Sequence, residues 1–119
     1  MSYDVSLYTP GKLCAACGHQ PDQINHFDRN HTSNCSQMWD EAGIELRKYA
    51  YRDDEHAAKA AELIPDLERA VTTMKAEPER FRAMNPENGW GSYESALSFI
   101  SAILAACREY PEALVYVSN

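Results

Sequence analysis

The stretch SYDVSLYT, residues 2–9, alternates apolar and polar side chains with a period of two. In an extended chain such alternation places one set of side chains on each face. One face would carry Tyr3, Val5 and Leu7, and the other Asp4, Ser6 and Tyr8. The pattern predicts a half-buried strand, which the turn residues Pro10-Gly11 end.

Two long segments further along the chain have helical periodicity. Residues 55–76 carry apolar side chains at steps of four and three, and Pro65 within them predicts a kink or a break. Residues 92–109 repeat these steps beside a second apolar stripe, which is typical of a helix packed on more than one side. Shorter helices are predicted at 34–43, with Asn34 or Ser36 as N-cap and Gly43 as C-cap, and from Pro78 onward.

The segment ALVYVS, residues 113–118, is rich in β-branched and aromatic residues and predicts a closing strand. INHFDRNHT, residues 24–32, is a weaker candidate for a further short strand. We therefore predict one α+β domain over residues 1–119. The N- and C-terminal strands would pair in a small antiparallel sheet, three to four helices would pack on one face, and residues 11–35 would form a loop rich in Cys and His.

The charge of the chain limits its partners. Its 119 residues include 18 acidic and 11 basic side chains, for a formal net charge of −7. This balance argues against binding to nucleic acid or to an anionic membrane, and it permits a basic protein partner. The N-terminus lacks the pattern of a signal peptide, and no apolar run could span a bilayer. We therefore expect a cytoplasmic protein, with its oligomeric state undetermined by the sequence.

Six of the eight Cys and His residues lie between positions 14 and 35. The pattern C-x2-C-x13-H-x3-C predicts a zinc site with the ligands Cys14, Cys17, His31 and Cys35. His26 or His19 could replace His31. Four protein ligands would make the site structural, with the metal holding the loop in place. The alternatives are a free or disulfide-forming cysteine pair and thiols without a role, whereas a thioredoxin-like redox motif lacks its βαβ context.

A second candidate site combines two polar loops. Asn30, Thr32 and Asn34 alternate near one strand end, and NGWGSY brings glycine backbone and aromatic rings to the start of the last helix. A helix N-terminus favours an anion, so a pocket for a nucleotide-like ligand is one interpretation. Its residues would be Asn30, Thr32, Asn34, Asn88, Trp90 and Tyr93. The alternative is purely structural, with Asn88-Gly89 as a turn, Ser92 as an N-cap and Trp90 as a core residue.

Several of these segments together resemble a known group of sequences. MSYDVSLY, the C-x-x-C-G loop, N-x-T-x-N, NPENGWGSYE and ACREYPEALVYVS are similar to small proteins encoded in bacteriophage and prophage genomes. The resemblance covers most of the chain and is most specific at residues 85–94. It implies a phage or bacterial cytosolic origin and implies no activity.

The sequence contains no P-loop, G-x-S-x-G, H-E-x-x-H or dinucleotide-binding fingerprint. It therefore favours a small acidic binding protein over an enzyme. Such a protein would modulate a host process, in the manner of an anti-defence protein, by binding a basic host protein or a small ligand. Two alternatives stay open: a small enzyme or nucleotide-like-ligand binder with its pocket at Asn30, Asn34 and Trp90, and an accessory structural phage protein without a ligand.

Overall fold

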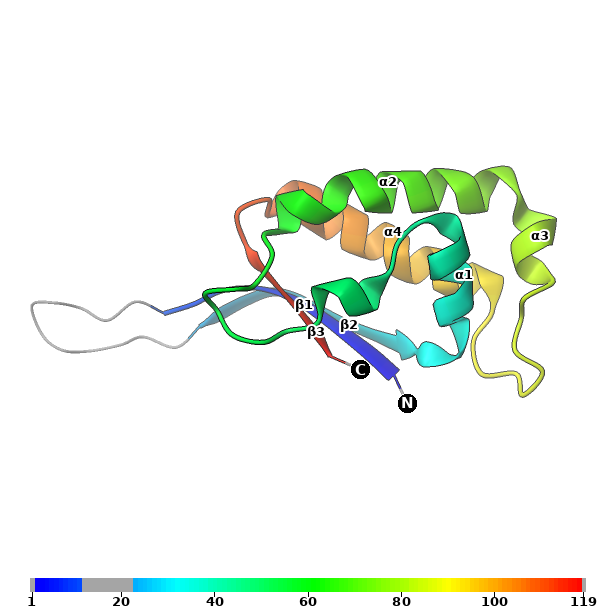
Figure 1. Cartoon of the computed structure of the whole chain (residues 1–119), viewed down its shortest axis with the longest axis horizontal. Coiled ribbons are helices and arrows are strands. Elements are labelled where there is room, and N and C mark those ends of the chain that lie inside the picture. The colour runs from blue at the N-terminus through cyan, green and yellow to red at the C-terminus, as the bar shows by residue number, and fades with distance from the viewer. Residues whose placement is uncertain (1, 12–22, 119) are drawn as a thin grey trace, which may run out of the picture.

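The structure, a computed structural model, describes residues 2–11 and 23–118. Its sheet has three antiparallel strands in the order β2-β1-β3, formed by β2 (Ile24–Thr32), β1 (Ser2–Thr9) and β3 (Leu114–Ser118). The first strand is thus central and pairs with the last, as predicted (Figure 1). The predicted α+β class is confirmed, and the weakly predicted strand at residues 24–32 exists with those bounds.

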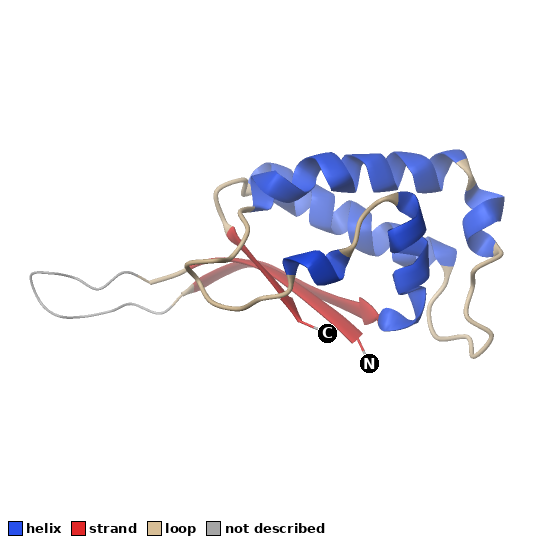
Figure 2. Cartoon of the chain, in the orientation of Figure 1, coloured by secondary structure: helices blue, strands red, loops and turns tan. Residues whose placement is uncertain are grey.

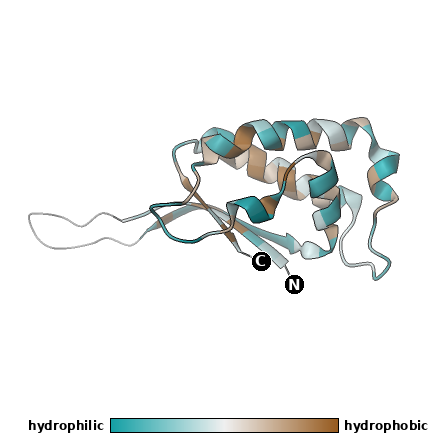
Figure 3. Cartoon of the chain, in the orientation of Figure 1, coloured by the Kyte–Doolittle hydropathy of each residue, from teal (hydrophilic) through white to brown (hydrophobic). Residues whose placement is uncertain are grey.

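The helices lie on one side of this sheet (Figure 2). They are α1 (Ser36–Ala42), α2 (Ala60–Ala76), α3 (Pro78–Arg82) and α4 (Tyr93–Glu109), with short 3-10 turns η1 (Ser33–Cys35) and η2 (Leu46–Tyr49). Hydrophobic and hydrophilic residues recur along α2 with the turn of the helix, and its buried side chains pack toward α4 (Figure 3). A single core joins the helices to the sheet.

The pairing register shows which face of β1 belongs to the core. Residues opposite each other in an antiparallel pair point to the same face. Val5 and Leu7 pair with Val117 and Val115 of β3, and all four side chains are buried. The side chains of Tyr3, Val5 and Leu7 therefore point to the helices, as the alternation in the sequence predicts.

Two buried aromatic residues hold α4 in place through hydrogen bonds to backbone carbonyls. The Trp39 Nε1–H donates to the Ala96 carbonyl oxygen at 3.2 Å, and the Tyr93 hydroxyl donates to that of Met74 at 2.7 Å. Buried aromatic side chains with polar tips need such partners. Their rings fill the space between the helices while no buried side-chain N or O atom of the described residues is left without a hydrogen bond.

Helix α2 begins at Ala60, five residues later than predicted. Asp53 does accept a hydrogen bond from the His56 N–H at 2.8 Å, but this turn does not continue as a helix. The N–H groups of Ala60 and Ala61 instead donate to the carbonyl oxygens of Ala113 and Pro111, just before β3. Contacts with a distant segment, which periodicity does not reveal, thus set the start of this helix.

Helices α2 and α1 differ in detail from the predicted ones. Helix α2 is not broken at Pro65, which is exposed, as is Ala61 four residues earlier. Water can therefore bond to the carbonyl that lacks a donor. Neither Asn34 nor Ser36 caps a helix; the Thr32 hydroxyl instead accepts the Asn34 N–H at 3.3 Å, so the chain turns through η1 first. Gly43 ends α1 with a φ of 114°, as predicted.

Candidate functional site

The face of the sheet that points away from the helices is polar and uncovered over much of its area. Its side chains on the central strand are half-exposed, whereas those on the other face are buried. A central strand exposes alternate residues only when nothing packs on that face. We call this surface the open face; it consists of Ser2, Asp4, Ser6, Asp28, Asn30, Thr32, Tyr116 and Ser118.

Carboxylates give the open face a negative character. Asp4 lies on its central strand, and Asp28 accepts a hydrogen bond from the Ser6 hydroxyl at 3.1 Å. Neither carboxylate has an ion-pair partner among the described residues. Elsewhere on the surface most arginines already pair with an acid, for example Arg108 with Glu68 at 2.9 Å.

A segment after η2 folds over one end of the open face. Asp54 accepts hydrogen bonds from the hydroxyls of Tyr8 and Tyr51, at 2.6 and 3.0 Å. Burial, and then the hydrogen bond to Asp54, raise the pKa of Tyr8 well above its usual value. The Tyr51 ring also lies 4.8 Å from that of Tyr116. These contacts fix the carboxylate of Asp54 and an aromatic pair against the sheet.

Large exposed hydrophobic side chains lie around the sheet. Within the described residues they are Ile24, Tyr51 and Trp90, with exposed fractions of 59%, 37% and 67%. Tyr51 lies at one end of the open face, against Tyr116. Trp90 precedes Gly91, where an added Cβ would lie 2.8 Å from Thr32 Cγ2, so the backbone beside Trp90 runs close to Thr32. Exposed aromatics beside carboxylates are typical of a protein-binding surface.

The two loops of the predicted nucleotide pocket meet at Gly91. An added Cβ there would lie 2.7 Å from Cys35 Sγ and 3.3 Å from His31 Cε1, so the loops are in contact at this point. Tyr93 is buried in the core. The structural alternative explains Asn88, whose side chain accepts the Trp90 N–H at 2.9 Å, and Ser92, which caps α4. It is wrong for Trp90, which is not a core residue.

The remaining residues of that predicted site have separate places. Asn30 lies exposed on β2, Thr32 caps η1, and Asn34 is exposed at the surface of η1. Asn30 and Thr32 therefore belong to the open face, where Asn30 lies opposite Asp4. The alternation in the sequence correctly placed these two on one face, where Asp4 and Asp28 are also found.

The predicted zinc ligands fall into two groups. Cys14, Cys17 and His19 lie outside the described residues, which end at Gly11 and resume at Gln23. His31 and Cys35 lie at the far end of β2, roughly 20 Å along the strand from Ile24. His26 instead lies three positions after Gln23, where the described residues resume. Its Nε2 is 2.8 Å from Thr9 Oγ1, and its ring is 4.6 Å from that of Tyr110.

His31 and Cys35 have partners within the fold. His31 Nδ1 lies 2.9 Å from the Thr32 carbonyl oxygen, which can only accept, and Nε2 lies 2.8 Å from Ser95 Oγ. Cys35 is buried, and burial raises the pKa of its thiol. Within the described residues no three His, Cys, Asp or Glu side chains are grouped so as to hold a metal ion. The zinc site stays a prediction. His26 is a better candidate than His31 for its third ligand, because His26 lies closer along the chain to Cys14 and Cys17.

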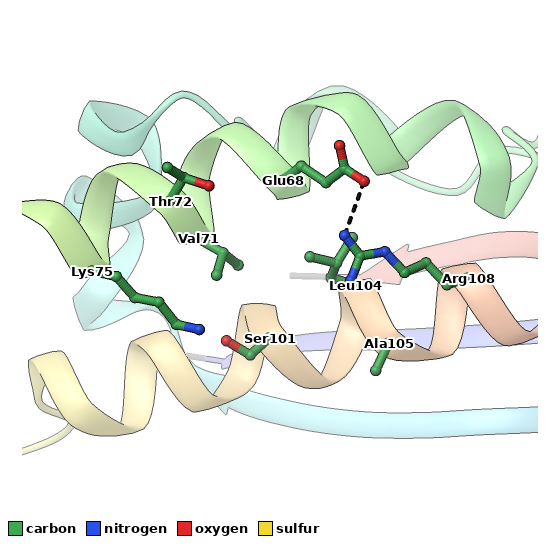
Figure 4. A pocket seen from close by; sticks show the side chains of 8 residues that line it. All are labelled: Glu68, Val71, Thr72, Lys75, Ser101, Leu104, Ala105 and Arg108. Carbon is green, nitrogen blue, oxygen red and sulfur yellow. Dashed lines mark hydrogen bonds and ion pairs between the residues drawn. The ribbon is translucent and has the colours of Figure 1, made fainter.

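A groove runs between the outer sides of helices α2 and α4 and has a volume of about 590 Å³. Val71 and Leu104 point into it, the ion pair of Glu68 and Arg108 lies at one end, and Lys75 reaches toward Ser101 at the other (Figure 4). Its charges do not favour a partner of either sign. The groove therefore identifies no ligand.

Comparison with known proteins adds no assignment. No protein-family model matches the chain, and no curated protein or solved structure is significantly similar to it. Within residues 2–11 and 23–118, every helix is too short or too polar to cross a bilayer. The sequence had not singled out Asp4, Asp28, Tyr51 or Tyr116, because only strand register and the folded 51–56 segment bring them to one surface.

Proposed function

We propose that this protein binds a basic protein partner through the open face of its sheet. The observation that supports this most strongly is the exposure of Asp4 and Ser6 on a central strand, with the helices on the opposite side only (Figure 2). An uncovered sheet face that carries Asp4, Asp28 and Asn30 attracts lysine and arginine side chains. Complementary charge speeds the encounter and selects the partner.

The exposed aromatic residues would contribute most of the affinity. Tyr51 packs against Tyr116 with tilted rings and is held by Asp54, so it loses little conformational freedom on binding. Trp90 exposes 67% of its surface. Buried tyrosine and tryptophan side chains dominate most protein interfaces, whereas charges at the rim contribute orientation and rate. The surface thus combines an aromatic anchor, Tyr51, with an acidic centre, and the loop that carries Trp90 approaches it at Thr32.

A phage or prophage origin, which is an expectation from the sequence motifs, would make the partner a host protein. A small acidic domain that covers a basic surface would block whatever else binds there. This would modulate a host process, such as a defence, inside the bacterial cell. No catalytic group is needed for this action.

Site-specific photo-crosslinking tests the proposal. A benzophenone amino acid replaces Tyr116 on the open face in one variant and Thr72 on the outer side of α2 in another. Each variant is exposed to bacterial lysate and its adducts are identified by mass spectrometry. We expect one dominant adduct with a basic protein from position 116, and none of comparable yield from position 72.

Charge reversal provides the matched control. Asp4→Lys with Asp28→Lys should lower the yield of the adduct by about tenfold or more, because like charges then face each other. Glu45→Lys with Glu109→Lys changes the net charge equally at exposed positions off the open face and should leave the yield unchanged. Equal losses in both double variants, or an acidic partner, would overturn the proposal.

A further inference from the structure

A hollow of about 310 Å³ lies beside η2 and is lined by basic side chains. Three of the 11 Lys and Arg residues of this acidic chain line it, namely Arg47, Lys48 and Arg52, together with His56. The other lining residues are Tyr49, Ala50, Ala57 and Ala58, so none of the lining residues is acidic. Such a concentration of cations opposes the net charge of −7.

Two of these cations have no acidic partner. No carboxylate in the described part of the chain lies within ion-pair distance of Lys48 or Arg52. The other two have exposed partners at the rim. Arg47 lies 3.4 Å from Asp40, and His56 lies 2.8 Å from Asp53. Like charges gathered in one hollow repel one another, so an anion between Lys48 and Arg52 would be stabilised.

The fold holds both walls of the hollow against one strand. On one side Ala50 bridges to Val117, and the Tyr51 N–H donates to the Val117 carbonyl oxygen at 2.9 Å. On the other side the Val115 N–H donates to the Ala58 carbonyl oxygen at 2.8 Å. The segment between residues 50 and 58 is thus an arc with both ends fixed to β3, and compact loops of this kind frequently carry function.

Tyr49 supports the wall between these attachments. Its hydroxyl donates to Asp66 of α2 at 2.9 Å, and burial together with this hydrogen bond raises its pKa to about 12. The ring therefore stays neutral and fixed below the cations. The hollow is anchored to the sheet and to a helix, so its shape does not depend on a ligand.

We propose that this hollow binds a small molecule that carries phosphate groups. Lysine and arginine are the usual phosphate ligands in proteins, since the guanidinium forms paired hydrogen bonds and the ammonium acts as a point charge. The volume is near the lower end of the roughly 300–1,000 Å³ typical of ligand pockets. It suits pyrophosphate or a nucleoside phosphate better than a larger cofactor. Lys48 and Arg52 are the residues that contact the phosphates.

Isothermal titration calorimetry of the full chain tests this site with pyrophosphate and ADP, and with adenosine as an uncharged control. We expect saturable binding of pyrophosphate and ADP, and none of adenosine. Lys48→Ala and Arg52→Ala should each weaken binding about tenfold, the usual effect of losing one charge-assisted hydrogen bond. Lys48→Arg should retain binding, since it keeps the charge.

Lys75→Ala is the matched control, because Lys75 also has no ion-pair partner among the described residues but lines the α2–α4 groove. It should leave the affinity unchanged. Absence of saturable binding of both phosphate compounds would overturn the proposal, as would an equal loss in Lys75→Ala. Melting temperatures of the exposed Lys48 and Arg52 variants should match the unmutated chain, which shows that any loss is local. Failure here leaves the open-face proposal intact, since the two sites share no residue.

Discussion

The two faces of the sheet show how one strand serves two purposes. On the helical face Tyr3, Val5 and Leu7 are buried, while Asp4 and Ser6, their immediate neighbours, are half-exposed on the open face. The first set contributes stability through burial of apolar surface, and the second contributes little to stability. Residues one position apart are therefore expected to differ sharply when mutated.

Leu7→Ala should cause the largest effect and Ser6→Ala almost none. Leu7 is fully buried, so its truncation leaves a cavity and should lower the free energy of unfolding by about 2–5 kcal/mol. Ser6 loses only an exposed hydrogen bond to Asp28, which should cost less than about 0.5 kcal/mol. Urea unfolding followed by circular dichroism measures both. Similar losses in the two variants would show that the open face is covered.

Two glycines of the 85–92 loop provide a second comparison, between a position with close neighbours and one without. Gly91 has a φ of 96°, and a Cβ there would lie 2.7 Å from Cys35 Sγ, so Gly91→Ala should cost about 1–3 kcal/mol. Gly89 has a φ of 74°, but a Cβ would meet nothing within 4 Å, so Gly89→Ala should cost about 1 kcal/mol. Thermal unfolding of both variants measures the difference. If Gly89→Ala is the more harmful, the contact between this loop and η1 is not formed.

The dependence of stability on alkaline pH tests the raised pKa of Tyr49, whose hydroxyl bonds to helix α2. Tyr49 has its pKa raised to about 12 by burial and by its hydrogen bond to Asp66, whereas an unfolded tyrosine ionises near pH 10. Because the folded state holds this proton more tightly, its contribution to stability is complete below about pH 10 and is lost as pH rises through about 12. Tyr49→Phe should flatten the fall of unfolding free energy over that window. An unchanged slope would contradict the assignment.

The two ends of β2 can be compared by metal analysis. If the predicted zinc site exists, protein purified without chelator should contain about one equivalent, and Cys14→Ser should remove it and lower the melting temperature. His26→Ala should then reduce zinc content more than His31→Ala, because His26 lies near the connection to the cysteine segment. Equal zinc in Cys14→Ser and in the unmutated chain would exclude the site. A larger loss of zinc in His31→Ala than in His26→Ala would support the ligand set Cys14, Cys17, His31 and Cys35.

Much of the architecture follows from local sequence. The alternation in residues 2–9 predicts β1 with its bounds, and the apolar stripes of residues 92–109 predict α4. Ser92 and Gly43 are a cap and a turn at the predicted places. These features are predictable because each depends on residues within a few positions of one another.

The sites follow less directly, because their residues come from separate parts of the chain. Asp54 and Tyr8 are 46 positions apart and meet at 2.6 Å. The basic hollow exists because Ala50 and Ala58 both attach to β3, and its cations lie among polar residues that carry no periodic signal. The approach of Gly91 to Cys35 is likewise a long-range contact that the sequence does not reveal.

The sequence by itself therefore determined the elements, their order and the charge of the protein, because strand and helix periods, caps and net charge are local or additive properties. Tertiary structure decided which acids and bases gather on each surface, and contacts with the segment before β3 join the local cap between Lys59 and Glu62 in setting where α2 begins. The physical reason is that these outcomes depend on which segments cover one another. Only the folded chain contains that information.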